Sequence, residues 1–245
     1  MTRWRRWFLG ISTVLSILVL ELKETWLVSQ LFTTAGSMFV SLIVYAYAFG
    51  WFFATGFVLL LLAHEWGHIL AIWVLGLGSR GPLFIPFVGA VVQLRRLPKS
   101  VGGDAGIALA GPAMGTLSAL VCLIIYLWTD HKLWLVLAYT GCLLNLFNLI
   151  PSNPLDGGRI APAISTKLWI VGLIVLGFIF IKTFNPFLLI ILLVALLRMR
   201  DSAAEDLPDA YFFVSPLMRF KIAVWYFTIL GVVSMATIFT HQLLR

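Results

Sequence analysis

A histidine–glutamate–histidine cluster lies in the middle of a long apolar run. The run is WFFATGFVLLLLAHEWGHILAIWVLGLG, and its polar residues are His64, Glu65 and His68. Because about 20 apolar residues span a bilayer, residues 52–76 are predicted to form a membrane-embedded helix. An acidic side chain at the centre of such a helix costs about 2.5–3.5 kcal/mol on insertion scales. A cluster placed there at that cost indicates a functional site.

The spacing of the two histidines predicts a metal site. Residues four apart lie on the same face of a helix, so His64 and His68 can bind one metal ion. In the HExxH arrangement the glutamate lies at the flank of the metal, where it can act as a base. As an alternative, the histidines would hydrogen-bond to neighbouring helices while Glu65 held them in register. The apolar surroundings, together with an aspartate motif later in the chain, favour the metal site.

The composition places most of the chain in the membrane. Hydrophobic residues make up 61% of the sequence and charged residues 11%, and the mean hydropathy is +1.02. We therefore predict an all-α polytopic membrane protein with about six to eight transmembrane helices. The net charge of +7 does not indicate nucleic-acid binding, because most Lys and Arg flank apolar spans. Cys122 and Cys142 lie within apolar runs and predict no disulfide.

The apolar runs divide the chain into three parts. They are N-terminal membrane segments over 1–51, a central core over 52–165 that holds the His-Glu-His cluster, and C-terminal transmembrane helices over 166–245. Residues 7–30 are short for a full span, so we expect them to lie in the interface or to pack as a re-entrant piece, with a full crossing as the alternative. Most Lys and Arg gather at one set of span ends, which the positive-inside rule assigns to the cytoplasm. We expect a multi-pass protein of a bacterial-type plasma membrane, with its active site toward the cytoplasm.

Residues 77–103 interrupt the helical pattern. The stretch GPLFIPFVGAVVQL is apolar, but it is too short and too rich in Gly and Pro for a spanning helix. Phe84, Ile85 and the valines that follow favour extended structure. We expect a re-entrant β-like loop, which membrane depth permits only where the loop is buried in protein or lines a wet cavity. An amphiphilic surface loop is the alternative.

The next predicted span, 105–128, has a face of small residues that suits close helix packing. This small-residue face consists of Gly106, Ala110, Gly111, Ala113, Gly115, Ser118 and Ala119.

A catalytic zinc usually has three protein ligands, so a third donor is expected on another segment. Asp156 is the best candidate, in NLFNLIPSNPLDGGRI at the end of the predicted span 133–150. Prolines end that helix, and Gly157-Gly158 are expected to allow a tight turn that aims the carboxylate back at the metal. The alternative is that Asp156 caps a following helix. His131 and His241 fall on the opposite side of the membrane in this topology.

Two motifs together resemble the site-2 protease family of intramembrane zinc metalloproteases. They are HEWGH at 64–68 and Asn148-x-x-Pro-x-x-x-x-Asp156-Gly157, separated by two spans. The resemblance implies that His64, His68 and Asp156 bind zinc, that Glu65 is the catalytic base, and that Asn148 holds substrate or the developing oxyanion. Asn145, one turn earlier, could share the role of Asn148. The loop GPLFIPFVGA resembles the family's re-entrant loop, and Gly115 stands where many members have Asn.

The expected function is zinc-assisted hydrolysis of peptide bonds in or near transmembrane segments. Its partners would be a transmembrane protein substrate and the lipid bilayer, without nucleic acid. One alternative is a membrane transporter with a metal site, which does not require a glutamate beside a ligand. Another is a catalytically inactive relative that acts as a scaffold. Changing Glu65 to Gln distinguishes these functions, because only proteolysis needs the base.

Overall fold

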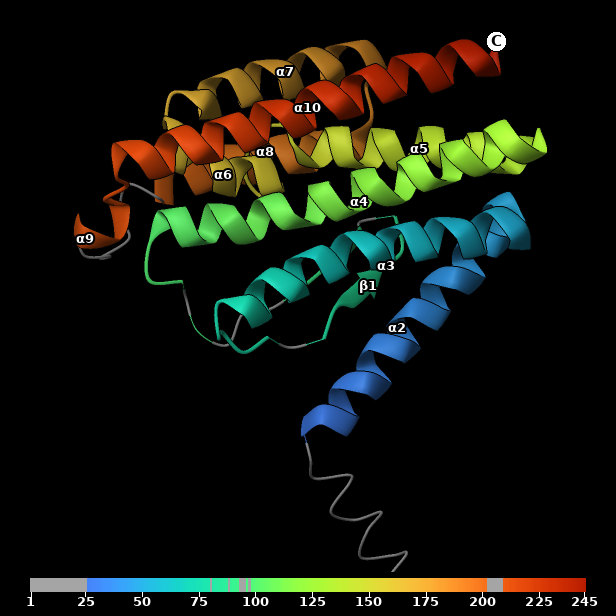
Figure 1. Ribbon diagram of the computed structural model, residues 1–245, viewed down its shortest axis with the longest axis horizontal. Helices are drawn as coiled ribbons and strands as arrows, with labels where there is room; N and C mark the ends of the chain where they lie inside the picture. The colour runs from blue at the N-terminus through green and yellow to red at the C-terminus, as the bar shows by residue number, and fades with distance from the viewer. Residues whose placement is uncertain (1–25, 80, 88, 93–95, 97, 202–208) are drawn as a thin grey trace, which may run out of the picture.

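The computed structural model describes residues 26–79, 81–87, 89–92, 96, 98–201 and 209–245, and this part of the chain is mostly helical (Figure 1). Residues 7–30, for which a crossing of the bilayer is an open prediction, lie mainly outside the described residues. The elements in chain order are α2 (Trp26–Phe49), α3 (Trp51–Val74), β1 (Leu83–Ile85), β2 (Gly89–Val91), α4 (Val101–Thr129), α5 (Lys132–Asn148), α6 (Asp156–Ile164), α7 (Leu168–Thr183), α8 (Pro186–Asp201), α9 (Asp209–Phe212) and α10 (Pro216–Leu244).

The chain is a multi-pass membrane protein. Within the described residues, four helices are long and apolar enough to cross a bilayer: Phe32–Phe49, Trp51–Val74, Val101–Thr129 and Pro216–Leu244. Leu168–Thr183 and Leu188–Leu197 are apolar but shorter. The predicted class, a helical polytopic protein, is confirmed at this level, and the count of six to eight spans stays a prediction.

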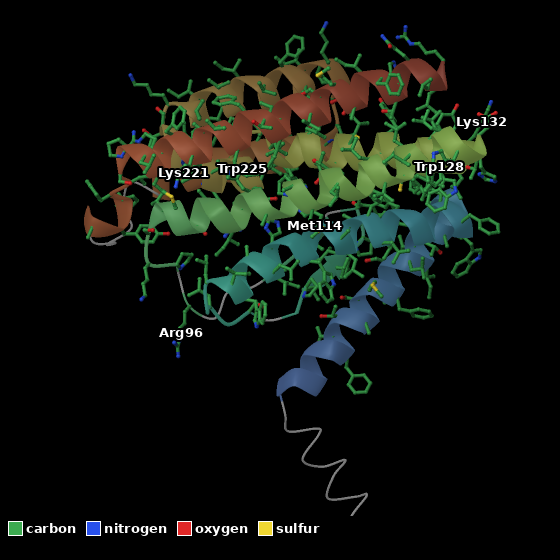
Figure 2. The ribbon with its side chains drawn as sticks, in the orientation of Figure 1. Arg96, Met114, Trp128, Lys132, Lys221 and Trp225 are labelled. Carbon is green, nitrogen blue, oxygen red and sulfur yellow. The ribbon has the colours of Figure 1, made fainter. Side chains whose placement is uncertain are left out.

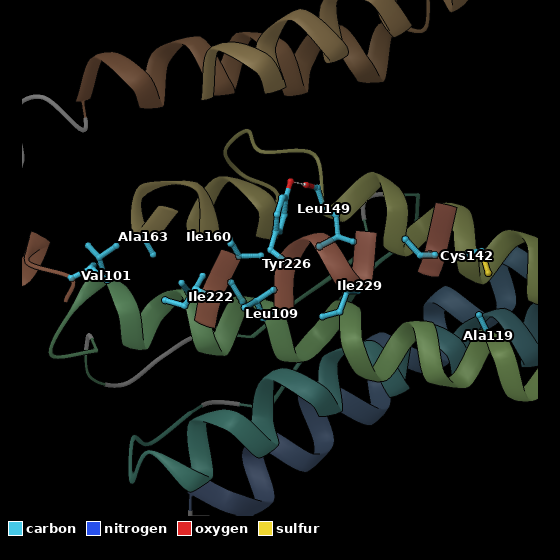
Figure 3. Close-up of a cluster of buried hydrophobic side chains, with 14 of the residues drawn as sticks. Val101, Leu109, Ala119, Cys142, Leu149, Ile160, Ala163, Ile222, Tyr226 and Ile229 are labelled. Carbon is cyan, nitrogen blue, oxygen red and sulfur yellow. Dashed lines mark hydrogen bonds between the residues drawn. The ribbon is translucent and has the colours of Figure 1, made fainter. Parts of the chain in front are cut away.

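Helix α4 occupies the centre of the bundle. It packs against α3 on one side and against α5, α6 and α10 on the other, while α2 leans away and contacts α3 and β1 (Figure 1). Figure 3 shows the buried apolar cluster that joins α4 to α10, in which Leu109 lies near Ile222 and Ile229. In the same cluster the Tyr226 hydroxyl donates to the Leu149 carbonyl at 2.7 Å. This bond ties α10 to the end of α5.

The interrupted region contains a short antiparallel hairpin, which confirms the extended structure predicted there. Strand β1 pairs with β2 in the register Leu83↔Val91, Phe84↔Ala90 and Ile85↔Gly89. Helix α2 holds the hairpin, because the Phe84 amide donates to the Ser37 hydroxyl at 3.1 Å and the Phe87 amide donates to the Tyr45 hydroxyl at 2.9 Å. The outer edge of β1 is therefore bonded to α2.

Candidate metal centre

Three electron-pair donors converge on one point between α3 and α6. The His64 Nε2 and His68 Nε2 atoms lie 3.1 and 3.3 Å from the Asp156 Oδ2 atom, and 3.2 Å from each other. Tetrahedral ligands at zinc bond lengths of about 2.0–2.1 Å lie about 3.3 Å apart. The donor triangle therefore has the size that a tetrahedral metal ion of this kind requires.

Helix α3 supplies the two histidines from its inward face. His64, Glu65 and His68 are all buried, at 3%, 5% and 6% exposure, whereas Trp66 points outward at 52%. The i and i+4 positions put both imidazoles on one face, one turn apart. The neighbouring Gly67 lets α4 approach, because a Cβ atom there would collide with the Ala110 carbonyl.

Helix α6 supplies the third donor with its first residue, Asp156. The N-cap position belongs to Leu155, so the alternative in which Asp156 caps this helix is not what the structure shows. The predicted tight turn at Gly157-Gly158 is wrong, because both glycines are helical. They serve close packing instead, since a Cβ atom on either would collide with the backbone of the 149–153 turn.

Several bonds fix α6 in place. The Trp169 indole donates to the Gly158 carbonyl at 2.8 Å, and the Arg159 guanidinium binds Asp104 of α4 at 2.6 Å. Arg159 also lies 4.0 Å from the Asp156 Oδ1 atom, on the side away from the donor triangle. Burial opposes the charge on Asp156, but the adjacent imidazoles outweigh it and hold the pKa of the carboxyl below its usual range. The side chain is therefore a carboxylate, as a metal ligand must be.

The other ring nitrogen of each histidine also has a partner. His68 Nδ1 lies 2.9 Å from the Ile107 carbonyl oxygen, and His64 Nδ1 lies 2.8 Å from Asn145 Oδ1. A carbonyl oxygen accepts only, so His68 Nδ1 donates to it, and Nε2 is the nitrogen left to bind a metal ion. Hydrogen bonds of this kind orient metal-binding histidines in proteins generally.

Two known proteins are similar to parts of this chain. A zinc metalloprotease of Methanocaldococcus jannaschii is 37% identical over 124 residues, which is 47% of this chain and 36% of that protein. The chain thus spans only about a third of the length of the curated relative it matches. A match to the solved structure of a site-2 protease from the same organism covers 82% of this chain and 86% of that one, at 22% identity and a TM-score of 0.44. No protein-family model matches the chain.

The two sequence motifs supply donors to a single metal-sized triangle, and the curated relative is a zinc metalloprotease. Among the described residues, His64, His68 and Asp156 form the cluster whose ligand atoms lie close enough for one metal ion. His131 caps α5 instead, and His241 stacks on Tyr139.

A cavity of about 520 Å³ opens beside the donor triangle. Glu65 and Asn148 both line it, together with Phe87 and Ala90 of the hairpin region and Ile191 of α8. The base candidate and the oxyanion candidate therefore border the same space as the three donors. Residues from segments far apart in sequence complete the walls.

The structure assigns Asn145 a place that the sequence does not reveal. Its side chain is buried behind His64, while Asn148 is the asparagine found in the described cavity lining. Gly115 makes room for it, because a Cβ atom there would collide with the Asn145 amide. Gly111 similarly makes room for the His68 ring. The small-residue face of α4 thus leaves space for the His68 ring and for the Asn145 side chain, and it also allows close helix packing.

Proposed function

We propose that the chain is an intramembrane zinc metalloprotease that hydrolyses peptide bonds in or near transmembrane segments of other membrane proteins. The observation that carries this proposal is the donor triangle beside Glu65 in a cavity among apolar helices. A structural metal site is closed by four protein ligands, whereas a catalytic zinc keeps a position open. Three donors that border a cavity fit the catalytic kind.

In this proposal His64, His68 and Asp156 hold the zinc. Zinc bound there supplies a Lewis acid that activates water and polarises a peptide carbonyl. Glu65 lines the same cavity, so its carboxylate takes the proton of the attacking water and returns it to the leaving amine. The Asn148 amide, also in the lining, donates a hydrogen bond to the developing oxyanion.

The cavity lining favours an apolar, extended substrate. Tyr45, Phe57, Leu61 and Leu144 contribute much of its surface. A helical substrate must unwind locally to expose a carbonyl, and the freed backbone then needs hydrogen-bond partners. Ala90 of β2 pairs with Phe84, whose amide points away toward Ser37. In an antiparallel pair the opposite residue then turns its own amide and carbonyl outward, so Ala90, which lines the cavity, can offer them to the opened substrate backbone.

The charge distribution supports an active site toward the cytoplasm of a bacterial-type plasma membrane. Figure 2 shows Arg96 and Lys221 near the end of the bundle where α4 begins, and Lys132 with Trp128 at the other end. By the positive-inside rule we assign the first end to the cytoplasm. The short apolar helices α7 and α8, with α5, would bring the number of crossing segments into the range of six to eight.

Glu65→Gln tests this function directly. The purified wild type, Glu65→Gln and Trp66→Leu proteins are reconstituted in vesicles with a panel of single-span peptides, and products are identified by mass spectrometry. Wild type and Trp66→Leu are expected to cleave within or near the apolar segment, because Trp66 faces outward. Glu65→Gln is expected to keep its zinc but lose cleavage by at least about 100-fold.

Two further results would contradict the proposal. Equal cleavage by Glu65→Gln and wild type would exclude Glu65 as the base. Zinc flux across wild-type vesicles without cleavage of any peptide would favour a transporter. A chelator that removes zinc is expected to stop cleavage, and zinc is expected to restore it.

A further inference from the structure

We propose that Asn145 is a positioning residue that fixes the orientation and protonation pattern of His64 and thereby sets the affinity of the site for zinc. This inference rests on the proposed function, since it takes His64 to be a zinc ligand. Asn145 belongs to α5, and its side chain is buried at 2% exposure. Its Oδ1 atom lies 2.8 Å from His64 Nδ1, and its Nδ2 atom donates to the Gly141 carbonyl at 2.7 Å.

The second of these bonds determines which end of the amide faces the imidazole. The Gly141 carbonyl oxygen only accepts hydrogen bonds, so the Asn145 NH₂ group must point toward it. Reversing the amide would place two oxygens against each other in a buried site, which costs the desolvation of both. The Asn145 oxygen is therefore the atom that faces His64.

The orientation of the amide in turn determines the proton on His64. An amide oxygen accepts a hydrogen bond, so the His64 Nδ1 atom must carry a proton and donate it. A neutral imidazole then has its lone pair on Nε2, the atom that lies 3.1 Å from Asp156 Oδ2. The chain of bonds from Gly141 through Asn145 thus leaves the correct nitrogen free to bind metal.

The position of the amide is enforced by packing against α4. A Cβ atom at Gly115 would collide with Oδ1, Cγ and Nδ2 of Asn145, so only glycine leaves the space that this amide fills. His68 has an equivalent partner, but it is the backbone carbonyl of Ile107. Of these two hydrogen-bond partners, only Asn145 can be removed by substituting a side chain, because the partner of His68 is a backbone carbonyl.

The chain provides a matched control one turn away. Asn148 has the same side chain on the same helix, but it lines the cavity. Zinc affinity is measured on zinc-free wild type, Asn145→Leu, Asn145→Asp and Asn148→Leu in detergent, by competition with a chromophoric chelator. Asn145→Leu is expected to bind zinc about 10–100-fold more weakly than wild type. Asn148→Leu is expected to bind zinc like wild type while cleaving peptides more slowly.

Asn145→Asp separates the hydrogen-bond acceptor from simple packing. It keeps an oxygen for the His64 Nδ1 proton, and in its protonated form its second oxygen donates to the Gly141 carbonyl as the amide does, so it is expected to bind zinc more tightly than Asn145→Leu. The absorption spectrum of the cobalt-substituted proteins is expected to change in Asn145→Leu, because the His64 ring is no longer fixed, and to stay unchanged in Asn148→Leu. A purely structural role of Asn145 would not produce this order of zinc affinities or this change in the cobalt spectrum.

Circular dichroism and gel filtration of the zinc-free proteins establish that each variant is folded, and Asn145→Ala replaces Asn145→Leu if the latter does not fold. Wild-type zinc affinity in the folded leucine or alanine variant would overturn the proposal. Asn145→Asp binding no tighter than that variant would overturn it as well. The two proposals fail separately: weakened zinc binding without any wild-type cleavage would contradict only the protease function.

Discussion

Gly111→Ala should destroy the metal centre although the glycine is not itself a ligand. A Cβ atom at this position would lie within 3.0 Å of Nε2, Cε1 and Cδ2 of the His68 ring. Optimal contacts between such atoms are about 3.5–4.0 Å, so the ring must retreat by about 1 Å. Metal–ligand distances tolerate only about ±0.2 Å. The required movement is therefore about five times what coordination allows.

Neither neighbour can relieve this collision cheaply. Helix α4 packs on its other side against α5, α6 and α10, and the Ala110 carbonyl already contacts Gly67. A retreating ring would also break the 2.9 Å contact between His68 Nδ1 and the Ile107 carbonyl. We expect zinc affinity to fall at least about 100-fold, which is about 2.8 kcal/mol at 1.4 kcal/mol per tenfold.

The assay is zinc content by mass spectrometry together with chelator competition. Gly106→Ala is the matched control, because among the described residues nothing lies within 4 Å of a Cβ atom placed there. It lies on the same helix but is exposed, and it should bind zinc like wild type. Wild-type zinc affinity in folded Gly111→Ala would refute the geometric reasoning.

Two further predictions concern the third donor and the bond that joins α10 to the end of α5. Asp156→Ala should lower zinc content from about one ion per chain to a small fraction of that at limiting zinc, because two histidines alone remain; an unchanged zinc content would remove Asp156 from the ligand set. Tyr226→Phe should lower the free energy of unfolding by about 1–3 kcal/mol, since it leaves the buried Leu149 carbonyl without its 2.7 Å bond. An SDS titration measures this loss, and equal stability of the two proteins would contradict it.

Local patterns were sufficient for much of the fold. The apolar runs predicted spans at 52–76 and 105–128, and the structure has α3 at Trp51–Val74 and α4 at Val101–Thr129. The Gly- and Pro-rich interruption between them predicted extended structure, and the hairpin β1–β2 is found there. These features depend on composition and periodicity over a few turns, which a sequence displays directly.

The pairing of His64 with His68 was also local, because a spacing of four residues places both on one helix face. Asp156 was selected by motif and resemblance, but its approach to His64 over 92 residues depends on how α6 packs. The turn predicted at Gly157-Gly158 is wrong, because a helical Gly-Gly pair and a turning one have the same sequence. Their contact with the 149–153 backbone decides between the two.

The sequence by itself determined a helical membrane chain with a His-Glu-His cluster in one span and an aspartate to complete it. Only the tertiary structure decided that Asn145, 81 residues from His64, supports that histidine, and that Gly111 and Gly115 leave space for the site. The physical reason is that these contacts depend on the rotation and axial position of α4 and α5 relative to α3. Packing of whole helices sets those quantities, and no short stretch of sequence contains them.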